Sequence, residues 1–247
     1  MTTGSLKSSL KSYRPIDMKH NIILSMFVAA GLLLSSGEAV AQWRLSAIAG
    51  ADINSHLVNS QFAYDYHYVP EWGYTFGVEV EYAFSDWFSL KAGLDAISKN
   101  FKMTRSGFYK NIYEAQKNTY LQLPVMASFS FGGQRLRGFL NVGPYAGVQL
   151  SRFKKGITPV VVAGYSGVMQ YSDYNIRNDF SAKADNRFDA GIVAGVGIGF
   201  QVSELIGLAL EVRDSQSLVS TKKTSRVVST LDLNNTCAFL VSISFSL

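Results

Sequence analysis

Charged side chains recur within segments of this chain in which apolar and polar residues alternate. The clearest example is Glu79 and Glu81, two carboxylates that stand two residues apart among valine and aromatic residues. Residues two apart on an extended strand share one face, so these carboxylates would lie side by side and could carry out proton transfer. The other charged residues in such segments are Arg44, Asp52, Lys91, Asp95, Asp189, Glu211 and Arg213.

These nine residues include both signs of charge, and a charge that is removed from water needs a partner. We therefore expect a paired network with a structural role, in which Arg44, Lys91 and Arg213 neutralise the carboxylates. Two alternatives remain open. The same polar set could line a narrow pore or a small-ligand site, or the glutamate pair could transfer protons.

Residues that could form a hydrolytic or metal centre are few. After residue 41 the chain has two histidines, His56 and His67, and only His67 has a carboxylate close by, Asp65. These residues form no convincing catalytic triad and lack the tight ligand spacing of a metal site. The single cysteine, Cys237, excludes an internal disulfide and a cysteine-based zinc cluster. We therefore expect no catalytic residue, no metal, no cofactor and no enzymatic activity.

The alternation itself predicts the elements that hold the charged residues. Over residues 72–84, thirteen in all, every second residue is apolar or aromatic. Such length indicates a strand that is much longer than the usual five or six residues. Aromatic residues at both ends, with valines between them, are typical of a strand that crosses a lipid bilayer. The apolar face would then contact lipid, and the charged face would point into a barrel.

The same alternation predicts eight strands, which begin near residues 43, 72, 88, 120, 140, 188, 206 and 238. The joints at 85–86, 132–134 and 203–204 are short, whereas those at 55–71, 99–118, 153–186 and 219–235 are long. This pattern indicates an all-β, eight-stranded, antiparallel, up-and-down transmembrane β-barrel in the outer membrane of a Gram-negative cell. Both termini would be periplasmic. A soluble lipocalin-like barrel, with its apolar side chains inside, is the competing fold.

Glycines on the inward face of the sixth strand suggest a packing role. These residues are Gly191, Gly195, Gly197 and Gly199. We expect them to leave room for large inward side chains such as Tyr120, Phe139 and Tyr145. A nucleotide site is a poor alternative because the run lies within a strand and no helix follows it.

Two segments resemble a known family. Residues 119–150, TYLQLPVMASFSFGGQRLRGFLNVGPYAGVQL, are similar to the YLQ/EIP … GPYAG segment of the PorT-like outer-membrane β-barrel proteins of the Bacteroidetes. Residues 187–200, RFDAGIVAGVGIGF, resemble the glycine-rich strand of that family, and the resemblance extends over most of 42–247. One departure is the final residue, Leu247, because outer-membrane barrels usually end in an aromatic residue.

The resemblance implies an integral outer-membrane barrel with a structural or interaction role. A role accessory to a secretion apparatus of the type IX kind, or to surface assembly, would fit a member of this family. The alternative function is that of a barrel for small-ligand binding or narrow-pore transport.

Residues 1–41 predict a signal peptide. The apolar run at 22–34 is thirteen residues long, Lys19 and His20 precede it, and Ala39-Val40-Ala41 is an A-x-A cleavage site. A transmembrane anchor is the alternative, but the run is shorter than the roughly 18 to 20 residues that span a bilayer. The barrel domain would then comprise 42–247. A start at Met18 would make 1–17 an over-extended beginning.

Charge suggests the partners. The chain has a net charge of +5, with scattered basic residues, which excludes nucleic acid as a good candidate. The long loops collect cations, including Lys154, Lys155, Lys222 and Lys223. We expect them to contact outer-membrane lipid and the phosphates of lipopolysaccharide, with other envelope proteins as further partners; a solvated surface is the alternative. The aromatic segment 62–72 could bind a sugar by stacking or form an interfacial belt.

Overall fold

The computed structural model describes residues 42–58, 65–161, 169–177, 180–181, 185–222 and 232–247. The predicted signal peptide at 1–41 and Lys223 lie outside these residues. Within the described part, no helix is long and apolar enough to cross a membrane. The elements are β1 (Gln42–Val58), β2 (Tyr66–Ala83), β3 (Phe88–Ser98), β4 (Phe101–Arg105), the 3-10 turn η1 (Gly107–Tyr109), β5 (Tyr113–Gly132), β6 (Leu136–Val161), β7 (Met169–Arg177), β8 (Phe188–Gln201), β9 (Ile206–Ser217) and β10 (Asp232–Ser246).

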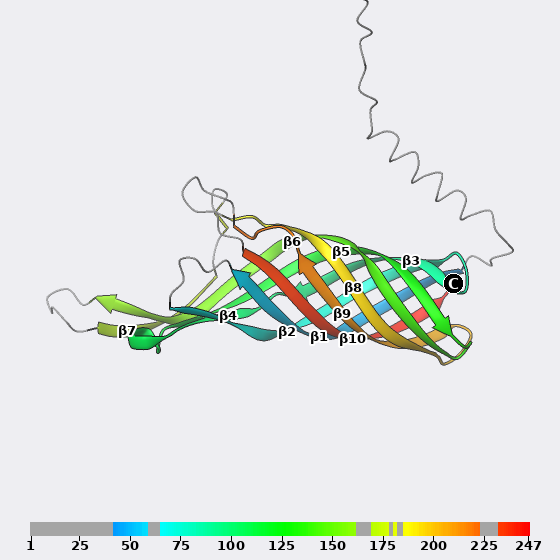
Figure 1. Cartoon of the computed structure of the whole chain (residues 1–247), viewed down its shortest axis with the longest axis horizontal. Helices are drawn as coiled ribbons and strands as arrows, with labels where there is room; N and C mark the ends of the chain where they lie inside the picture. Colours follow the sequence, from blue (N-terminus) through cyan, green and yellow to red (C-terminus); the bar gives the residue numbers. More distant parts are fainter. Residues whose placement is uncertain (1–41, 59–64, 162–168, 178–179, 182–184, 223–231) are drawn as a thin grey trace, which may run out of the picture. The chain divides into compact units, whose positions relative to one another are not determined.

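Eight of these strands close into a ring (Figure 1). β1 pairs with β2 on one side and with β10 on the other, and the ring continues through β3, β5, β6, β8 and β9. Every neighbouring pair is antiparallel. The predicted all-β, eight-stranded antiparallel barrel is therefore confirmed. A closed ring suits a wall in lipid because it leaves no backbone edge unpaired there.

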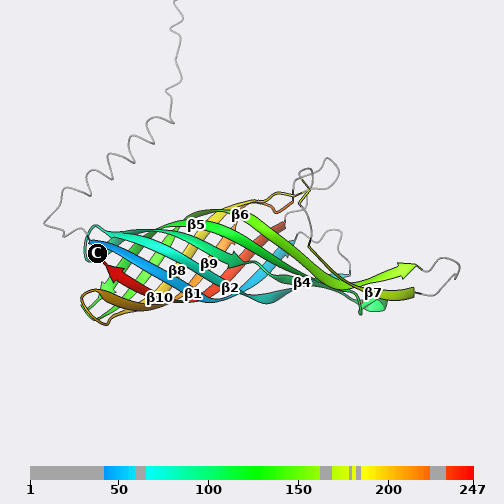
Figure 2. The ribbon, with the colours of Figure 1, turned by 180° about the vertical axis from the view of Figure 1, so that it is seen from behind.

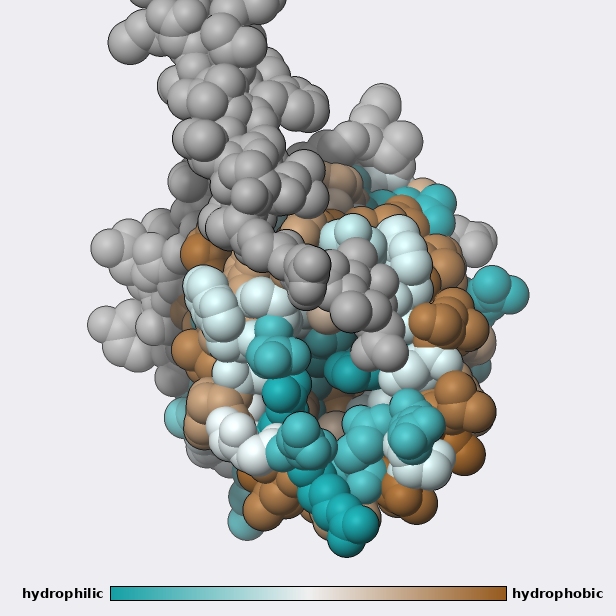
Figure 3. Space-filling view, turned by 90° about the vertical axis from the view of Figure 1, so that its right-hand side faces the viewer, coloured by the Kyte–Doolittle hydropathy of each residue, from teal (hydrophilic) through white to brown (hydrophobic). Residues whose placement is uncertain are grey.

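Apolar side chains cover the outside of the ring. Phe76, Val78 and Val80 on β2 are 53%, 53% and 41% exposed, whereas Glu79 and Glu81 are buried. Viewed from the end that carries the C-terminus, hydrophilic residues surround a central hollow and hydrophobic residues lie around them (Figure 3). This is the reverse of the arrangement in a soluble barrel with an apolar interior, so the lipocalin-like alternative is wrong.

The three predicted short joints are confirmed. They connect β2 to β3 at 84–87, β5 to β6 at 133–135, and β8 to β9 at 202–205. All three lie at the end of the barrel where β1 begins and β10 ends (Figures 1 and 2). We call this the short-turn end and the opposite end the long-loop end.

Three of the four predicted long loops, those at 55–71, 99–118 and 153–186, are wrong in large part, because strands occupy them. β4 follows β3 after two residues, β5 begins at Tyr113, β6 extends to Val161, and β7 pairs with the end of β6. The ladder between β1 and β2 stops at Glu71, and that between β6 and β8 stops at Val148. Beyond those residues the wall continues as a five-stranded projecting sheet (Figures 1 and 2). Its strands, in order, are residues 66–70 of β2, the whole of β4, residues 113–117 of β5, residues 152–161 of β6, and the whole of β7.

Register shifts mark the boundary between the ring and the projecting sheet. From Thr75 back to Pro70, β2 has one residue more than the paired stretch from Ile97 to Phe101. β6 also has one extra residue, Leu150, where its register with β5 shifts. An extra residue bends a strand and increases its twist. The two shifts therefore occur where the sheet departs from the closed cylinder.

Candidate functional site

One arginine and three carboxylates meet at the centre of the barrel. Arg213 on β9 is 4% exposed, and its Nη2 donates to Glu79 Oε1 at 2.7 Å and to Glu211 Oε2 at 2.8 Å. Its Nε donates to Glu211 Oε1 at 2.9 Å, and its Nη1 lies 3.4 Å from Asp95 Oδ2. Asn141 donates to Glu211 Oε1 at 2.9 Å. These five residues form what we call the central cluster, which ties β2, β3, β6 and β9 together across the lumen.

Glu81 lies closer to the short-turn end and has its own partners. Ser89 Oγ donates to Glu81 Oε1 at 2.6 Å, and Arg44 Nη1 donates to Glu81 Oε2 at 3.3 Å. Lys91 Nζ lies 3.8 Å from the same carboxylate and 4.7 Å from the centroid of the Phe139 ring. The two glutamates of the predicted pair thus bind different cations.

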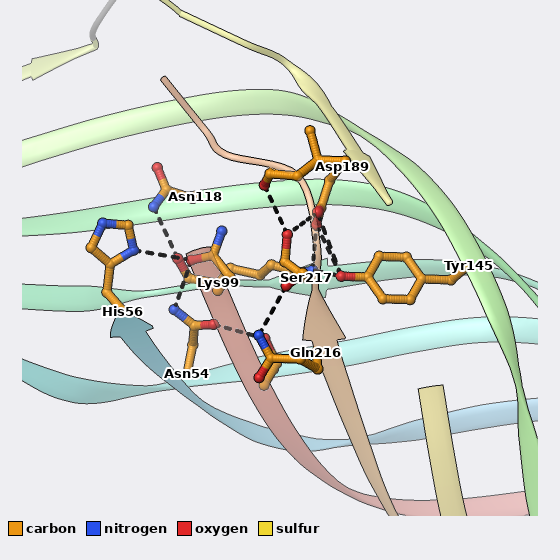
Figure 4. Close-up of polar contacts among 11 residues, drawn as sticks. Asn54, His56, Lys99, Asn118, Tyr145, Asp189, Gln216 and Ser217 are labelled. Atoms are coloured by element: carbon orange, nitrogen blue, oxygen red, sulfur yellow. Dashed lines mark hydrogen bonds and ion pairs between the residues drawn. The ribbon is translucent and has the colours of Figure 1, made fainter. Parts of the chain in front are cut away.

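Lys99 is a charged lumen residue that the sequence pattern does not predict, because Lys99 falls in a predicted loop. Its side chain is fully buried, and Nζ donates to Asp189 Oδ2 at 2.6 Å and lies 3.4 Å from Tyr145 Oη (Figure 4). Ser217 Oγ donates to Asp189 Oδ1 at 2.6 Å. The ammonium also lies 5.2 Å from the centroid of the Tyr120 ring. These five residues form the lysine cluster. Its spacing offered a clue, because Lys99 continues the inward series of Asp95.

The predicted nine residues all lie on the inner side of the wall. Asp52 is fully buried and accepts a hydrogen bond from Thr75 Oγ1 at 2.9 Å. Asp189 belongs to the lysine cluster, and Arg44 keeps 31% of its side chain exposed at the short-turn end. The remaining six lie in the contacts described above: Glu79, Glu81, Lys91, Asp95, Glu211 and Arg213.

On the long-loop side of the lysine cluster, amide side chains connect neighbouring strands. Asn54 Nδ2 donates to Asn234 Oδ1 at 3.3 Å, and His56 Nδ1 lies 3.2 Å from the same oxygen (Figure 4). Gln149 Nε2 donates to Asn118 Oδ1 at 3.0 Å. This amide belt holds β1, β5, β6 and β10 together where the ring gives way to the projecting sheet.

The two histidines in the described part of the chain lie in strands. His56 on β1 points inward, contacts Asp232 through Nε2, and stacks on Phe101 with centroids 3.9 Å apart. His67 on β2 is exposed, and Asp65 lies 3.8 Å from Arg105. Among the residues that the structure describes, no three of the types His, Cys, Asp and Glu are grouped so as to hold a metal ion.

A second carboxylate centre lies on the inner face of the projecting sheet. Glu114 accepts hydrogen bonds from Gln116 Nε2 at 2.6 Å, Tyr174 Oη at 2.8 Å and Lys154 Nζ at 3.0 Å. Burial alone raises the pKa of Glu114, but the hydrogen bonds from Lys154 and Tyr174 outweigh this effect and lower the pKa below its ordinary value. Lys154, one of the four lysines of the predicted lipopolysaccharide contact, thus forms an ion pair within the protein.

Two other lysines of that prediction, Lys155 and Lys222, have exposed side chains. Lys222 Nζ also lies 3.5 Å from Asp232 Oδ2. Near them, Arg152 Nη1 donates to Asp185 Oδ1 at 2.9 Å. Burial alone raises the pKa of Asp185, but the contact with Arg152 outweighs this effect and lowers it.

Polar cavities lie on both sides of the clusters. One of about 480 Å³ at the short-turn end is lined by residues that include Arg44, Glu81 and Lys91. One of about 270 Å³ at the long-loop end is lined by residues that include His56 and Glu114. Glu79 and Glu211 of the central cluster border the first cavity, and Tyr120 of the lysine cluster borders the second. The other charged members of the clusters line neither of these two cavities; they are Asp95, Lys99, Asp189 and Arg213. The lumen therefore has a polar cavity toward each end, with the ion pairs of the clusters between the two.

Comparison with known proteins gives a family match. A family model described as "Outer membrane protein beta-barrel domain" matches residues 40–223. No curated protein matches the chain.

Similar solved structures are outer-membrane or surface proteins. Neisserial surface protein A has a TM-score of 0.43 and 9% identity, over 82% of this chain and 96% of that one. OprG from Pseudomonas aeruginosa has a TM-score of 0.43 and 9% identity, over 86% and 99%. Ail from Yersinia pestis, in complex with the heparin analogue sucrose octasulfate, has a TM-score of 0.40 and 8% identity, over 83% and 99%.

Proposed function

This chain belongs to the outer membrane protein beta-barrel domain family, and from that premise we propose that it is a non-conducting outer-membrane barrel that holds an interaction module outside the membrane. The module is the projecting sheet, and its partners are other envelope proteins. In this proposal the long-loop end faces outward and both termini are periplasmic, since short turns are usual at the periplasmic end of such barrels.

The observation that carries the proposal is the continuation of strands past the ring. In the described residues, the 66–70 stretch of β2 pairs with β4 on one side only, and β7 pairs only with β6. Each therefore presents a row of backbone donors and acceptors along its second side. Such edges can receive an extended strand from another protein.

The filled lumen supports the non-conducting part of the proposal. An eight-stranded barrel is just wide enough inside for its side chains. Here the middle is occupied by the ion pairs of Arg213 and Lys99, with distances of 2.6–2.8 Å to their closest carboxylates. An ion passing through would have to separate these buried pairs, which costs several kcal/mol.

The finer proposal is a role accessory to a secretion apparatus of the type IX kind or to surface assembly. It is supported by the resemblance of 119–150 and 187–200 to PorT-like proteins. A scaffold of this kind would need a rigid anchor and an exposed edge, without chemistry of its own.

Photocrosslinking in living cells tests the interaction role. A photoreactive amino acid at Ser172 on β7 should crosslink to an envelope protein, and the same amino acid at the exposed, lipid-facing Leu140 is the matched control. A specific crosslink from position 172 alone would support the role. Equal labelling from both positions, or none from position 172, would contradict it.

The alternative is a barrel for small-ligand binding or narrow-pore transport, which the two cavities of about 480 and 270 Å³ favour. Conductance of the purified chain in planar bilayers separates the two functions. The wild-type protein should show no channel steps. Steps that disappear when the cavity at the short-turn end is blocked by a bulky Ser46→Trp change would favour transport.

A further inference from the structure

Four cations lie on the outer face of the projecting sheet, one on each of four neighbouring strands. They are Lys102 on β4, Lys117 on β5, Lys155 on β6 and Arg177 on β7. The last three are exposed and Lys102 is half-buried. In the described residues none of the four takes part in an ion pair, in contrast to Lys154 and Arg152 on the inner face.

The strand register places these cations in a zigzag. Ala115 is the cross-strand partner of both Lys102 and Lys155. Phe153 is the partner of both Lys117 and Arg177. Each cation is therefore a diagonal neighbour of the next, at a spacing of about 7–8 Å. We call these four residues the cationic stripe.

The surroundings of the stripe contain little negative charge. Its cross-strand partners are Val69, Ala115, Phe153 and Asn175, none of them acidic, and Asp173 lies diagonal to Lys155. No ion pair joins Asp173 to Lys155 in the structure, although both side chains are exposed. Four cations at this spacing repel one another, so an external anion with several charges would stabilise the sheet.

The stripe lies directly above the lipid-facing wall. Lys117 shares one side of β5 with Leu121 and Leu123, the latter 49% exposed. Leu121 follows Lys117 by four steps along the strand, which is roughly 13 Å along the strand and about 10 Å along the membrane normal for a tilt of about 40°. This height corresponds to the headgroup region of a bilayer.

Aromatic rings accompany two of the cations. Lys102 Nζ lies 4.6 Å from the centroid of the Tyr113 ring, and the Arg177 guanidinium lies 5.8 Å from that of Phe153. Rings of this type favour the membrane interface. Guanidinium and ammonium groups bind phosphate through short, charge-assisted hydrogen bonds.

We propose that the cationic stripe binds the phosphate groups of an outer-leaflet glycolipid, with each phosphate held between two neighbouring cations. The bound lipid would span β4 to β7 and brace the projecting sheet against the membrane surface. The inference does not depend on a non-conducting lumen or on a protein partner, so it can fail or succeed independently of them.

Lipid retention tests the proposal. The full-length protein is reconstituted with bisphosphorylated lipid A or with dephosphorylated lipid A of the same acyl chains, and bound lipid is counted by native mass spectrometry after detergent extraction. Wild-type protein should retain the bisphosphorylated form at least tenfold better. Changing Lys102, Lys117, Lys155 and Arg177 together to Gln should abolish this preference.

Two controls make the outcome specific. Lys102→Arg, Lys117→Arg and Lys155→Arg together keep the charges and should keep the preference. Lys110→Gln with Arg135→Gln removes exposed charges elsewhere and should leave it unchanged. Equal retention of both lipids by the wild type would overturn the proposal. The proposal would also be overturned if the stripe bound a sulfated oligosaccharide in water but the protein showed no preference between the two lipids.

Discussion

At the scale of single residues, the balance of charge in the lumen decides which side chains matter most. Arg213 is 4% exposed and serves three carboxylates, so each of them depends on it. Arg44 serves only Glu81, which also has Lys91 and Ser89, and 31% of its side chain is exposed. The same residue type thus has different importance at these two positions.

We predict that Arg213→Met destabilises the barrel by about 3 to 5 kcal/mol, because it leaves three buried carboxylates without their cation. The matched change Arg44→Met should cost about 0 to 1 kcal/mol, since the contact is partly screened by water. Urea unfolding of the reconstituted protein, followed by tryptophan fluorescence, measures both. Similar midpoints for the two variants would show that the central cluster contributes little.

Period-two alternation was sufficient to place the nine predicted residues in the interior, because side-chain direction on a strand is set by parity alone. It failed for Lys99 and His56, which lie next to segments without lipid-facing apolar residues. Their inward orientation depends on strand pairing beyond the ring. Pairing partners, such as Asp189 for Lys99, are distant in sequence, and a single chain does not reveal them.

At the scale of elements, the ring strands were predictable and their outer ends were not. Strands in the membrane must show an apolar face to lipid, which gives a readable pattern. β4 and β7 lie outside that environment. β4, FKMTR, has only five residues, and β7, MQYSDYNIR, places polar and aromatic residues on both of its faces. The sequence pattern therefore predicts loops here, although both strands continue the same sheet.

Two glycines of β8, Gly191 and Gly197, leave room for the large inward side chains that the sequence predicts as their neighbours. A Cβ on Gly191 would lie 2.8 Å from the Tyr145 ring, and one on Gly197 would lie 2.4 Å from the Phe139 ring. At Gly195 the neighbour is instead Glu211 of the central cluster, at 2.1 Å. Glycine thus lets aromatic and charged side chains share a narrow interior.

Gly143 on β6 offers the sharpest test of close strand approach. A Cβ there would lie 1.9 Å from the backbone oxygen of Val125, which no side-chain rotation can relieve. We predict that Gly143→Ala costs about 1 to 3 kcal/mol or more, as overpacking does.

The matched control is Gly199→Ala on the neighbouring β8. The nearest atoms to a Cβ there are 3.9 Å away, so the change should stay within about 0.5 kcal/mol. The gel shift between folded and heat-unfolded protein, recorded against temperature, compares the two variants. Equal melting temperatures would mean that β5 and β6 separate easily at Gly143.

At the scale of the whole molecule, the two ends of the barrel differ in length and chemistry. The short-turn end carries three brief connections, and the long-loop end carries the projecting sheet and its cationic stripe. This asymmetry gives the protein a direction in the membrane.

Cysteine labelling of intact cells tests that direction. In a Cys237→Ser background, which removes the single cysteine, Ser172→Cys on β7 should react with a membrane-impermeant maleimide. Ser203→Cys at a short turn should react only after the outer membrane is permeabilised. The opposite pattern would reverse the orientation and remove the stripe from the outer leaflet.

The central cluster also bears on how the barrel is made. Glu79 and Arg213 are 134 residues apart, and their strands, β2 and β9, lie near opposite edges of the sheet until β1 and β10 meet. An incomplete, curled sheet that entered hydrocarbon early would carry Glu79 and Asp95 toward one edge, separated from Arg213 and Glu211 toward the other. A fully inserted intermediate with β1 and β10 still separated would contradict this order. Seam closure therefore has to accompany insertion, and the neutralised interior is a product of that last step.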